Sequence, residues 1–94
     1  MIEMIFEELK RHGLVTSGSD FSEDWLGMEA SYFRAVRTKH RTVSAKALAT
    51  CAARLKRHAN ALQASSYPSV RERGGWYAQL AESCVSELLT TCES

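Results

Sequence analysis

Composition, the spacing of hydrophobic residues and the placement of turn residues predict an all-α domain of five helices. The chain has 94 residues with only one Pro and five Gly, and its abundant Ala, Leu, Glu, Lys and Arg favour helices. Hydrophobic residues recur at a period of about 3.6 along most of the chain. A chain of this length has room for one core. We therefore expect a single domain at 1–94, with a core domain at 1–66 and a C-terminal helix at 67–94.

Two helices are expected in the N-terminal part. The hydrophobic stripe of an amphipathic helix is formed by Ile2, Ile5, Phe6 and Leu9. Gly13 ends this helix. A short second helix is expected to begin near Asp20, which resembles a capping box together with Glu23 three positions later. Gly27 is expected to end it.

The third expected helix covers about residues 30–38. Its inward side carries Tyr32, Phe33 and Val36, and its other side carries Ala30, Ser31, Arg34, Arg37 and Thr38. A helix that is apolar on one face and basic or small on the other can pack on its neighbours and still enter a major groove about 12 Å wide. The pattern predicts the recognition helix of a helix-turn-helix.

Two further helices complete the domain. Ser44 is an N-cap for the fourth, which buries Leu48, Cys51, Ala52, Leu55, Ala59 and Leu62. Residues 64–67 break the pattern, and Pro68 suits the first turn of the fifth helix. That helix has a broad apolar face at 77–92. The face either covers the first and fourth helices or contributes to a dimer seam, as symmetric readers of palindromic sites need.

These helix phases predict one core. Ten of its side chains are expected to be Phe6, Leu9, Phe21, Trp25, Leu26, Phe33, Val36, Leu48, Ala52 and Leu55. The adjacent Gly74 and Gly75 in the fifth segment indicate a helix start, a kink or a close backbone approach.

Charge is distributed unevenly, although the formal net charge is only +1. Residues 30–71 carry nine basic side chains and no acid, whereas acids outnumber bases in residues 1–29 and 72–94. A solvated helix face balanced by acids packed alongside is one explanation of this block. The other is a footprint for a polyanion, because binding nucleic acid requires basic groups gathered on one surface.

The sequence offers no pattern typical of an enzyme, a secreted protein or a membrane protein. Its three cysteines make an odd number in helical segments, which favours a reducing cytoplasm over a disulfide framework. The acidic N-terminus lacks the features of a signal peptide, and no apolar run reaches membrane-spanning length. His12, His40 and His58 have no metal-ligand spacing. We therefore expect no catalytic residue, no metal, no cofactor and no membrane.

The middle of the chain resembles the Cro/CI (Xre-type) helix-turn-helix family of small bacterial or phage regulators. The resemblance covers about thirty residues and lies in Leu26-Gly27, Ser31-Tyr32-Phe33, Val36, Arg41, Ser44, Leu48, Ala52 and Leu55. It implies a Cro/CI repressor-like fold with a C-terminal helix, and double-stranded DNA as the ligand. The chain departs from the pattern at Glu23, where the family has a small residue that Ser22 replaces only after a one-residue shift. It departs again at Glu29, Arg37 and Lys39.

These observations predict a DNA-binding transcriptional regulator of the repressor type, with the helix at about 30–38 in the major groove. It is expected to act as a homodimer through the C-terminal helix. Residues expected to contact base edges are Ala30, Ser31, Arg34, Arg37 and Thr38. Residues expected to contact phosphates are Tyr32, Lys39, His40, Arg41, Ser44 and Lys46. The alternative is a protein-interaction module, such as an anti-activator or accessory subunit, whose basic face binds an acidic partner.

Overall fold

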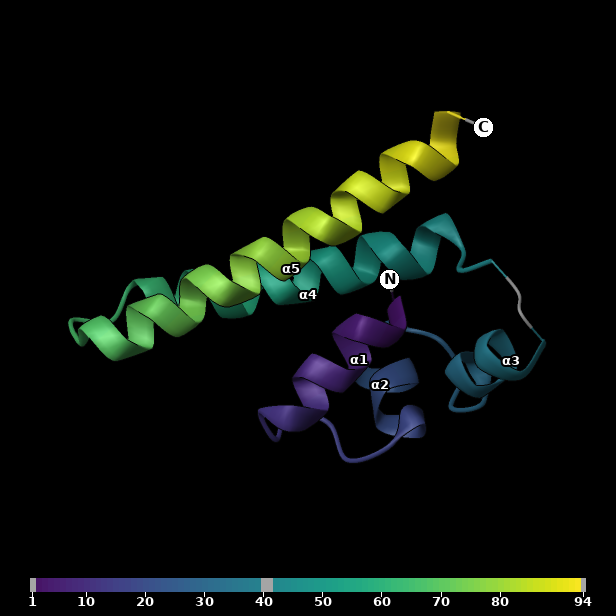
Figure 1. Ribbon diagram of the computed structural model, residues 1–94, viewed down its shortest axis with the longest axis horizontal. Helices are drawn as coiled ribbons and strands as arrows, with labels where there is room; N and C mark the ends of the chain where they lie inside the picture. Colours follow the sequence, from purple (N-terminus) through teal and green to yellow (C-terminus); the bar gives the residue numbers. More distant parts are fainter. Residues whose placement is uncertain (1, 40–41, 94) are drawn as a thin grey trace.

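Five helices account for most of the part of the chain that the computed structural model describes, residues 2–39 and 42–93, with side chains described to residue 90 (Figure 1). They are α1 (Ile2–Arg11), α2 (Gly18–Asp24), α3 (Tyr32–Lys39), α4 (Ala45–Gln63) and α5 (Pro68–Glu93). No strand occurs within these residues. The predicted all-α class with five helices is confirmed.

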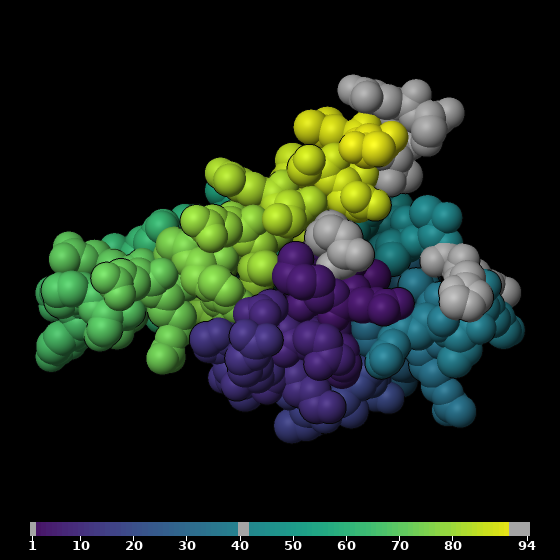
Figure 2. All heavy atoms as spheres, in the orientation of Figure 1, coloured from purple at the N-terminus to yellow at the C-terminus, as the bar shows by residue number. Residues whose placement is uncertain are grey.

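Helices α4 and α5 form a long antiparallel hairpin, against which α1, α2 and α3 pack as a lobe (Figure 1). The lobe lies beside the half of the hairpin where α4 begins, and the turn between α4 and α5 extends beyond it (Figure 2). Two buried contacts fix the register of the hairpin. The buried thiols of Cys51 and Cys84 lie next to each other, and the backbone at Gly74 comes so close to α4 that an added Cβ would lie 2.9 Å from the carbonyl oxygen of Ala59. Of the three alternatives for the glycine pair, the structure therefore has a close backbone approach at Gly74.

The predicted boundaries of α1, α4 and α5 agree with the structure because each has a local end signal. Gly13 follows α1 with a φ of 76°, a conformation that glycine adopts without strain. Ser44 is the N-cap of α4, and its side chain accepts a hydrogen bond from the Ala47 N–H. Pro68 is the first residue of α5.

Helix α2 begins earlier than the sequence suggested. Ser17, not Asp20, is the N-cap, and its hydroxyl accepts from the Asp20 N–H at 3.3 Å. The Asp20 carboxylate in turn accepts from the N–H and the hydroxyl of Thr16. The helix ends at Asp24, and Gly27 supplies the positive φ of 64° within the turn that follows.

Helix α3 begins later than predicted, at Tyr32 instead of about residue 30. Ala30 and Ser31 lie in a preceding turn, where the Glu29 carbonyl accepts from the Tyr32 N–H at 3.0 Å. The Ser31 carbonyl then accepts from the Ala35 N–H. The two residues therefore precede the helix while remaining beside its first turn.

All ten predicted core side chains are buried, and all except Val36 belong to one hydrophobic cluster. Three phenylalanine rings form its centre, with centroid distances of 5.4 Å for Phe6–Phe21 and 4.8 Å for both Phe6–Phe33 and Phe21–Phe33. The C-terminal helix belongs to the same core through Tyr77, Leu80, Ala81 and Cys84. Most of its apolar face therefore covers the rest of the domain, whereas Val85 and Leu89 are exposed.

Candidate nucleic-acid interface

Helix α3 is attached to the domain by its inner face. The side chains of Phe33 and Val36 are buried, and the hydroxyl of Ser22 on α2 accepts a hydrogen bond of 2.9 Å from the Phe33 N–H. The same hydroxyl donates to the Gly18 carbonyl at 2.9 Å. Because Phe33 is the second residue of α3, this bond satisfies an N–H group that has no partner inside the helix. The small residue that packs α2 on α3 is therefore Ser22, and Glu23 is exposed.

The outer face of α3 holds Arg34 and Thr38, two of the five predicted base-reading residues. Arg34 and Thr38 are exposed one turn apart, and the Thr38 hydroxyl donates to the Arg34 carbonyl at 2.9 Å. The guanidinium of Arg34 has no ion pair or hydrogen bond with another described residue. Beside the first turn of α3 lies a shallow hollow of about 340 Å³, lined by Gly18, Ser19, Ala30, Ser31 and Arg34. The structure therefore brings together Ala30, Ser31 and Arg34.

Arg37 does not share this outer face, contrary to the sequence interpretation. Its guanidinium lies 5.4 Å from the ring centroid of Phe33 and 5.9 Å from that of Phe6. The cause is helical geometry, because residues four apart lie on the same side of a helix. Arg37 thus covers the phenylalanine cluster with a cation–π contact, and using it to read bases would require the side chain to leave these rings.

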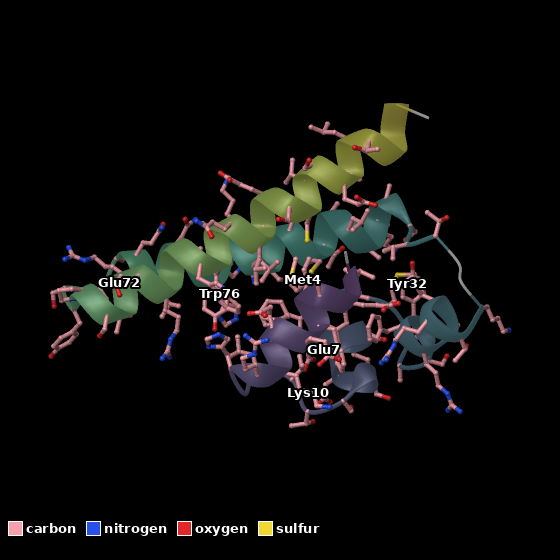
Figure 3. The ribbon with its side chains drawn as sticks, viewed as in Figure 1. Met4, Glu7, Lys10, Tyr32, Glu72 and Trp76 are labelled. Atoms are coloured by element: carbon pink, nitrogen blue, oxygen red, sulfur yellow. The ribbon has the colours of Figure 1, made fainter. Side chains whose placement is uncertain are left out.

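Tyr32 and Ser44, two predicted phosphate ligands, are bound to each other. The Tyr32 hydroxyl accepts from the Ser44 N–H at 2.9 Å and donates to the Ser44 hydroxyl at 3.4 Å. Figure 3 shows Tyr32 between α3 and the beginning of α4. This pair holds the N-terminus of α4 next to α3. The Ser44 hydroxyl is also engaged as the α4 cap, so phosphate contacts here fall to backbone N–H groups and neighbouring side chains.

The other predicted phosphate ligands lie at the two ends of the α3–α4 connection. Lys39 is the last residue of α3 and Lys46 is in the first turn of α4, and both are exposed. His40 and Arg41 lie outside the described residues. Lys39 and Lys46 therefore give the α3 side of the molecule positive charge at both ends of the connection.

Arg54 has a role that the sequence did not indicate. From α4 it donates to the carbonyl oxygens of Glu23, at 2.9 Å, and Asp24. These are carbonyls of the last turn of α2, where a cation is favourable. Arg54 thus fixes α2 to α4 and contributes little to a free basic face. No local signal could have predicted a contact between residues about thirty positions apart.

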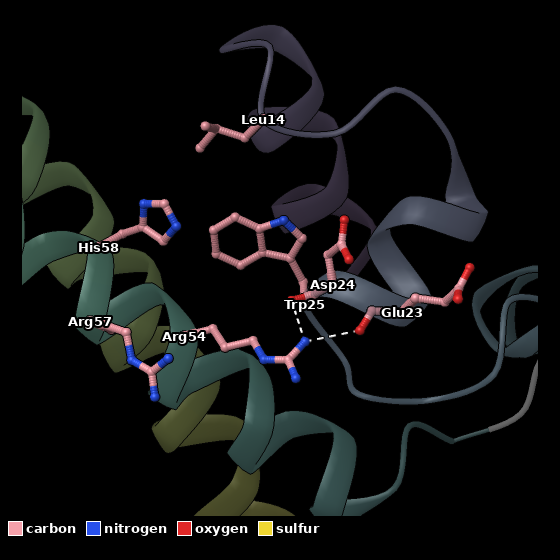
Figure 4. Close-up of a pocket in the computed structure, with 7 residues that line it drawn as sticks. All are labelled: Leu14, Glu23, Asp24, Trp25, Arg54, Arg57 and His58. Carbon is pink, nitrogen blue, oxygen red and sulfur yellow. Dashed lines mark hydrogen bonds between the residues drawn. The ribbon is translucent and has the colours of Figure 1, made fainter.

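A second hollow, of about 530 Å³, surrounds this contact (Figure 4). It is lined by Leu14, Glu23, Asp24, Trp25, Arg54, Arg57 and His58. The indole of Trp25 stacks on the imidazole of His58, with centroids 5.1 Å apart and an angle of 29° between the planes. Trp25 is only 5% exposed, and the lining contains two acids and two arginines. The hollow therefore presents no dominant charge and no large free aromatic surface to a ligand.

Within residues 2–39 and 42–93, no group of three or more His, Cys, Asp or Glu side chains is arranged to hold a metal ion. In the same part of the chain, every helix is too short or too polar to cross a membrane.

Comparison with known proteins places the chain in a family. No curated protein and no solved structure matches it. One family model does match, that of a family of unknown function, DUF6626, and the match covers residues 2–94. The description of this family gives no activity. Because the match extends over nearly the whole sequence, the chain belongs to the family of unknown function DUF6626.

Proposed function

We propose that this protein is a DNA-binding transcriptional regulator that inserts α3 into the major groove of duplex DNA and acts as a homodimer. The observation that carries the proposal is the two-sided character of α3. Phe33 and Val36 anchor its inner face, whereas Arg34 and Thr38 are exposed on the other side. An exposed Arg on a groove-sized helix can donate two parallel hydrogen bonds to O6 and N7 of a guanine.

The beginning of α4 supports the proposal by offering a phosphate site beside this face. The first N–H groups of a long helix have no partner inside it and attract anions. The Tyr32–Ser44 bond holds them next to α3, and Lys46 adds an exposed positive charge. Contacts of this kind position a protein on the DNA backbone without reading sequence.

The distribution of charge and the sequence pattern also support DNA binding through α3. Residues 30–71 contain no acid, so all charged side chains of α3 and of the start of α4 are basic, and Glu29 lies just before α3. The α2–α3–α4 segment resembles the Cro/CI pattern, although its small residue that meets α3, Ser22, lies one position earlier than in that pattern. Arg37 takes no part in base reading in this proposal, since it covers the phenylalanine rings.

The first experiment measures the affinity for random duplex DNA by fluorescence anisotropy as the salt concentration is raised. The proposal expects the logarithm of the binding constant to fall steeply and linearly with the logarithm of salt concentration. No binding even at low salt would overturn it. Binding of an acidic protein partner to the basic face would then become the better explanation.

The second experiment compares a selected duplex with random duplexes for three variants. Arg34→Ala should weaken binding to the selected duplex by roughly 1–3 kcal/mol and relax the preference at one base pair. Lys46→Ala should weaken binding to all sequences alike and reduce the salt slope by about one. Arg71→Ala is the matched control, because Arg71 is exposed near the turn of the hairpin, far from α3 (Figure 1).

Circular dichroism must confirm that each variant folds. Equal losses on both kinds of duplex for Arg34→Ala would mean that this side chain holds the backbone and does not read bases.

A further inference from the structure

An open apolar groove runs between α4 and α5. Its volume is about 620 Å³, and it is lined by Ala52, Ala53, Lys56, Ala59, Asn60, Gln63, Ala78, Ala81, Glu82, Val85, Ser86 and Leu89. The core side chains Leu48, Cys51 and Leu55 are not among these residues. Val85 is 44% exposed and Leu89 is 58% exposed. The small side chains would let another helix approach closely, and the exposed large ones have no cover within the described chain.

The two sides of this groove carry opposite charge. Helix α4 contains Lys and Arg but no acid, and Lys56 stands on its side of the groove. From Trp76 onward α5 contains Glu but no Lys or Arg, and Glu82 stands on its side. A surface with a basic and an acidic half is complementary to a rotated copy of itself, which is the condition for a two-fold dimer.

We propose that this groove binds the same groove of a second copy, with a two-fold axis that runs along the α4–α5 hairpin. Rotation about that axis places α4 opposite the partner's α5, so that basic and acidic sides meet. An axis across the helices would instead place α4 opposite the partner's α4, with like charges facing each other. The charges therefore favour a second copy of the chain as the partner, and they favour a two-fold axis along the hairpin over one across it.

The register of the hairpin makes the proposed charge pair reachable. Cys51 contacts Cys84, and Gly74 lies beside Ala59. Continuing the Cys51–Cys84 register places Lys56 level with position 79, three residues from Glu82. At about 1.5 Å of rise per residue this offset is roughly 4.5 Å along the axis, which a lysine side chain can span.

A two-fold axis along the hairpin also suits DNA binding through α3, and this step alone rests on the proposed function. Helix α3 lies at the end of the hairpin where α4 begins (Figure 1). An axis along the hairpin keeps the α3 helices of both copies at the same end, as a symmetric reader of a palindromic site requires. An axis across the hairpin would send them to opposite ends.

The test is sedimentation of the full chain without DNA, from about 1 to 100 µM, a range that reveals weak self-association. The wild-type protein should be a dimer at the upper end. Lys56→Glu and Glu82→Lys should each raise the dissociation constant roughly tenfold or more, because the reversed pair occurs twice. The double variant should recover the wild-type value. Glu72→Lys is the control, because Glu72 is exposed on α5 outside the groove.

A wild-type monomer at the highest concentration, or a double variant that stays as weak as the single ones, would overturn the interface. A spin label at Ser66→Cys in a Cys92→Ser background tests the axis. An axis along the hairpin leaves the two labels at the same height along the helices, whereas an axis across the middle of the groove, near position 58 of α4, would separate them along the helices by about 24 Å at 1.5 Å of rise per residue. A separation clearly greater than about 24 Å would refute the axis along the hairpin. Binding of random duplex by a monomer would leave DNA binding through α3 intact and remove only the homodimer, so failure of the interface and failure of DNA binding are distinguishable.

Discussion

Replacing Ser22 by Ala should lower the free energy of unfolding by about 1–3 kcal/mol, because it leaves a buried N–H group without a partner. Ser22 is 0% exposed, and its hydroxyl joins the Gly18 carbonyl to the Phe33 N–H through two hydrogen bonds of 2.9 Å each. The substitution removes one small polar atom, so lost hydrophobic packing contributes little. The cost is therefore that of the unpaired group and the loosened α2–α3 contact.

Urea unfolding followed by circular dichroism measures this loss. Ser19→Ala is the matched control, since Ser19 is an exposed serine on the same helix and should change the stability by no more than about 0.5 kcal/mol. For a domain of this size, each kcal/mol corresponds to a fall in Tm of about 4–8 °C. Amide exchange at Phe33 should also accelerate more than exchange in α1. Equal stabilities of the two variants would refute the structural role assigned to the Ser22 hydroxyl.

Two further predictions use matched pairs. Gly75→Ala should stabilise the protein by up to about 1 kcal/mol, because Ala is the better helix former and nothing lies within 4 Å of the added Cβ. Gly74→Ala should destabilise the protein, because the added Cβ would lie 2.9 Å from a backbone oxygen of α4. Urea unfolding measures both variants, and stabilisation by Gly74→Ala as well as by Gly75→Ala would contradict the close approach of Gly74 to α4. Burial raises the pKa of Tyr77 above its ordinary 10.0, against the opposing charge of Arg73, so the folded state keeps this proton where the unfolded chain has lost it. The resulting stability is present below about pH 10 and lost as the pH rises through the folded-state pKa. Tyr77→Phe should therefore reduce the loss of unfolding free energy as the pH rises above about 10. Tyr67→Phe is the control, because Tyr67 is 69% exposed, and it should leave that pH dependence unchanged. If the two variants lose stability with pH at the same rate, Tyr77 is not held protonated by burial.

Structural features that depend on a few neighbouring residues, such as buried helix faces and helix ends, were predictable from the sequence. Helical spacing identified most of the buried side chains, because a side chain's direction depends on its place in the helical repeat. It missed Ser22 of α2 and Ala47 of α4, which are small residues that hydrophobic spacing does not single out. Gly13, Ser44 and Pro68 marked helix ends, because capping and positive φ are local requirements. The start of α2 was misplaced because Ser17 and Asp20 are both good N-cap types three positions apart.

The candidate site was predictable in part for the same reason. Arg34 and Thr38 follow from the helical period of α3. The prediction placed Arg37 on the same outer face, whereas a spacing of four from Phe33 puts it on the Phe33 side, as the structure has it. The turn before α3 was harder to foresee, because Ala30 and Ser31 fit a first helical turn as well as the observed one.

The sequence by itself therefore determined the helices, their buried faces and the basic block at residues 30–71. Only the tertiary structure decided which polar groups connect the helices. Ser22 meets Phe33 from 11 positions away, Tyr32 meets Ser44 from 12, and Arg54 meets Glu23 from 31. The physical reason is that helix periodicity and capping are short-range, whereas the partner of a polar group depends on which segments the hydrophobic core brings together. The α4–α5 groove also depends on the tertiary structure, because it forms only when the two helices pack in their observed register.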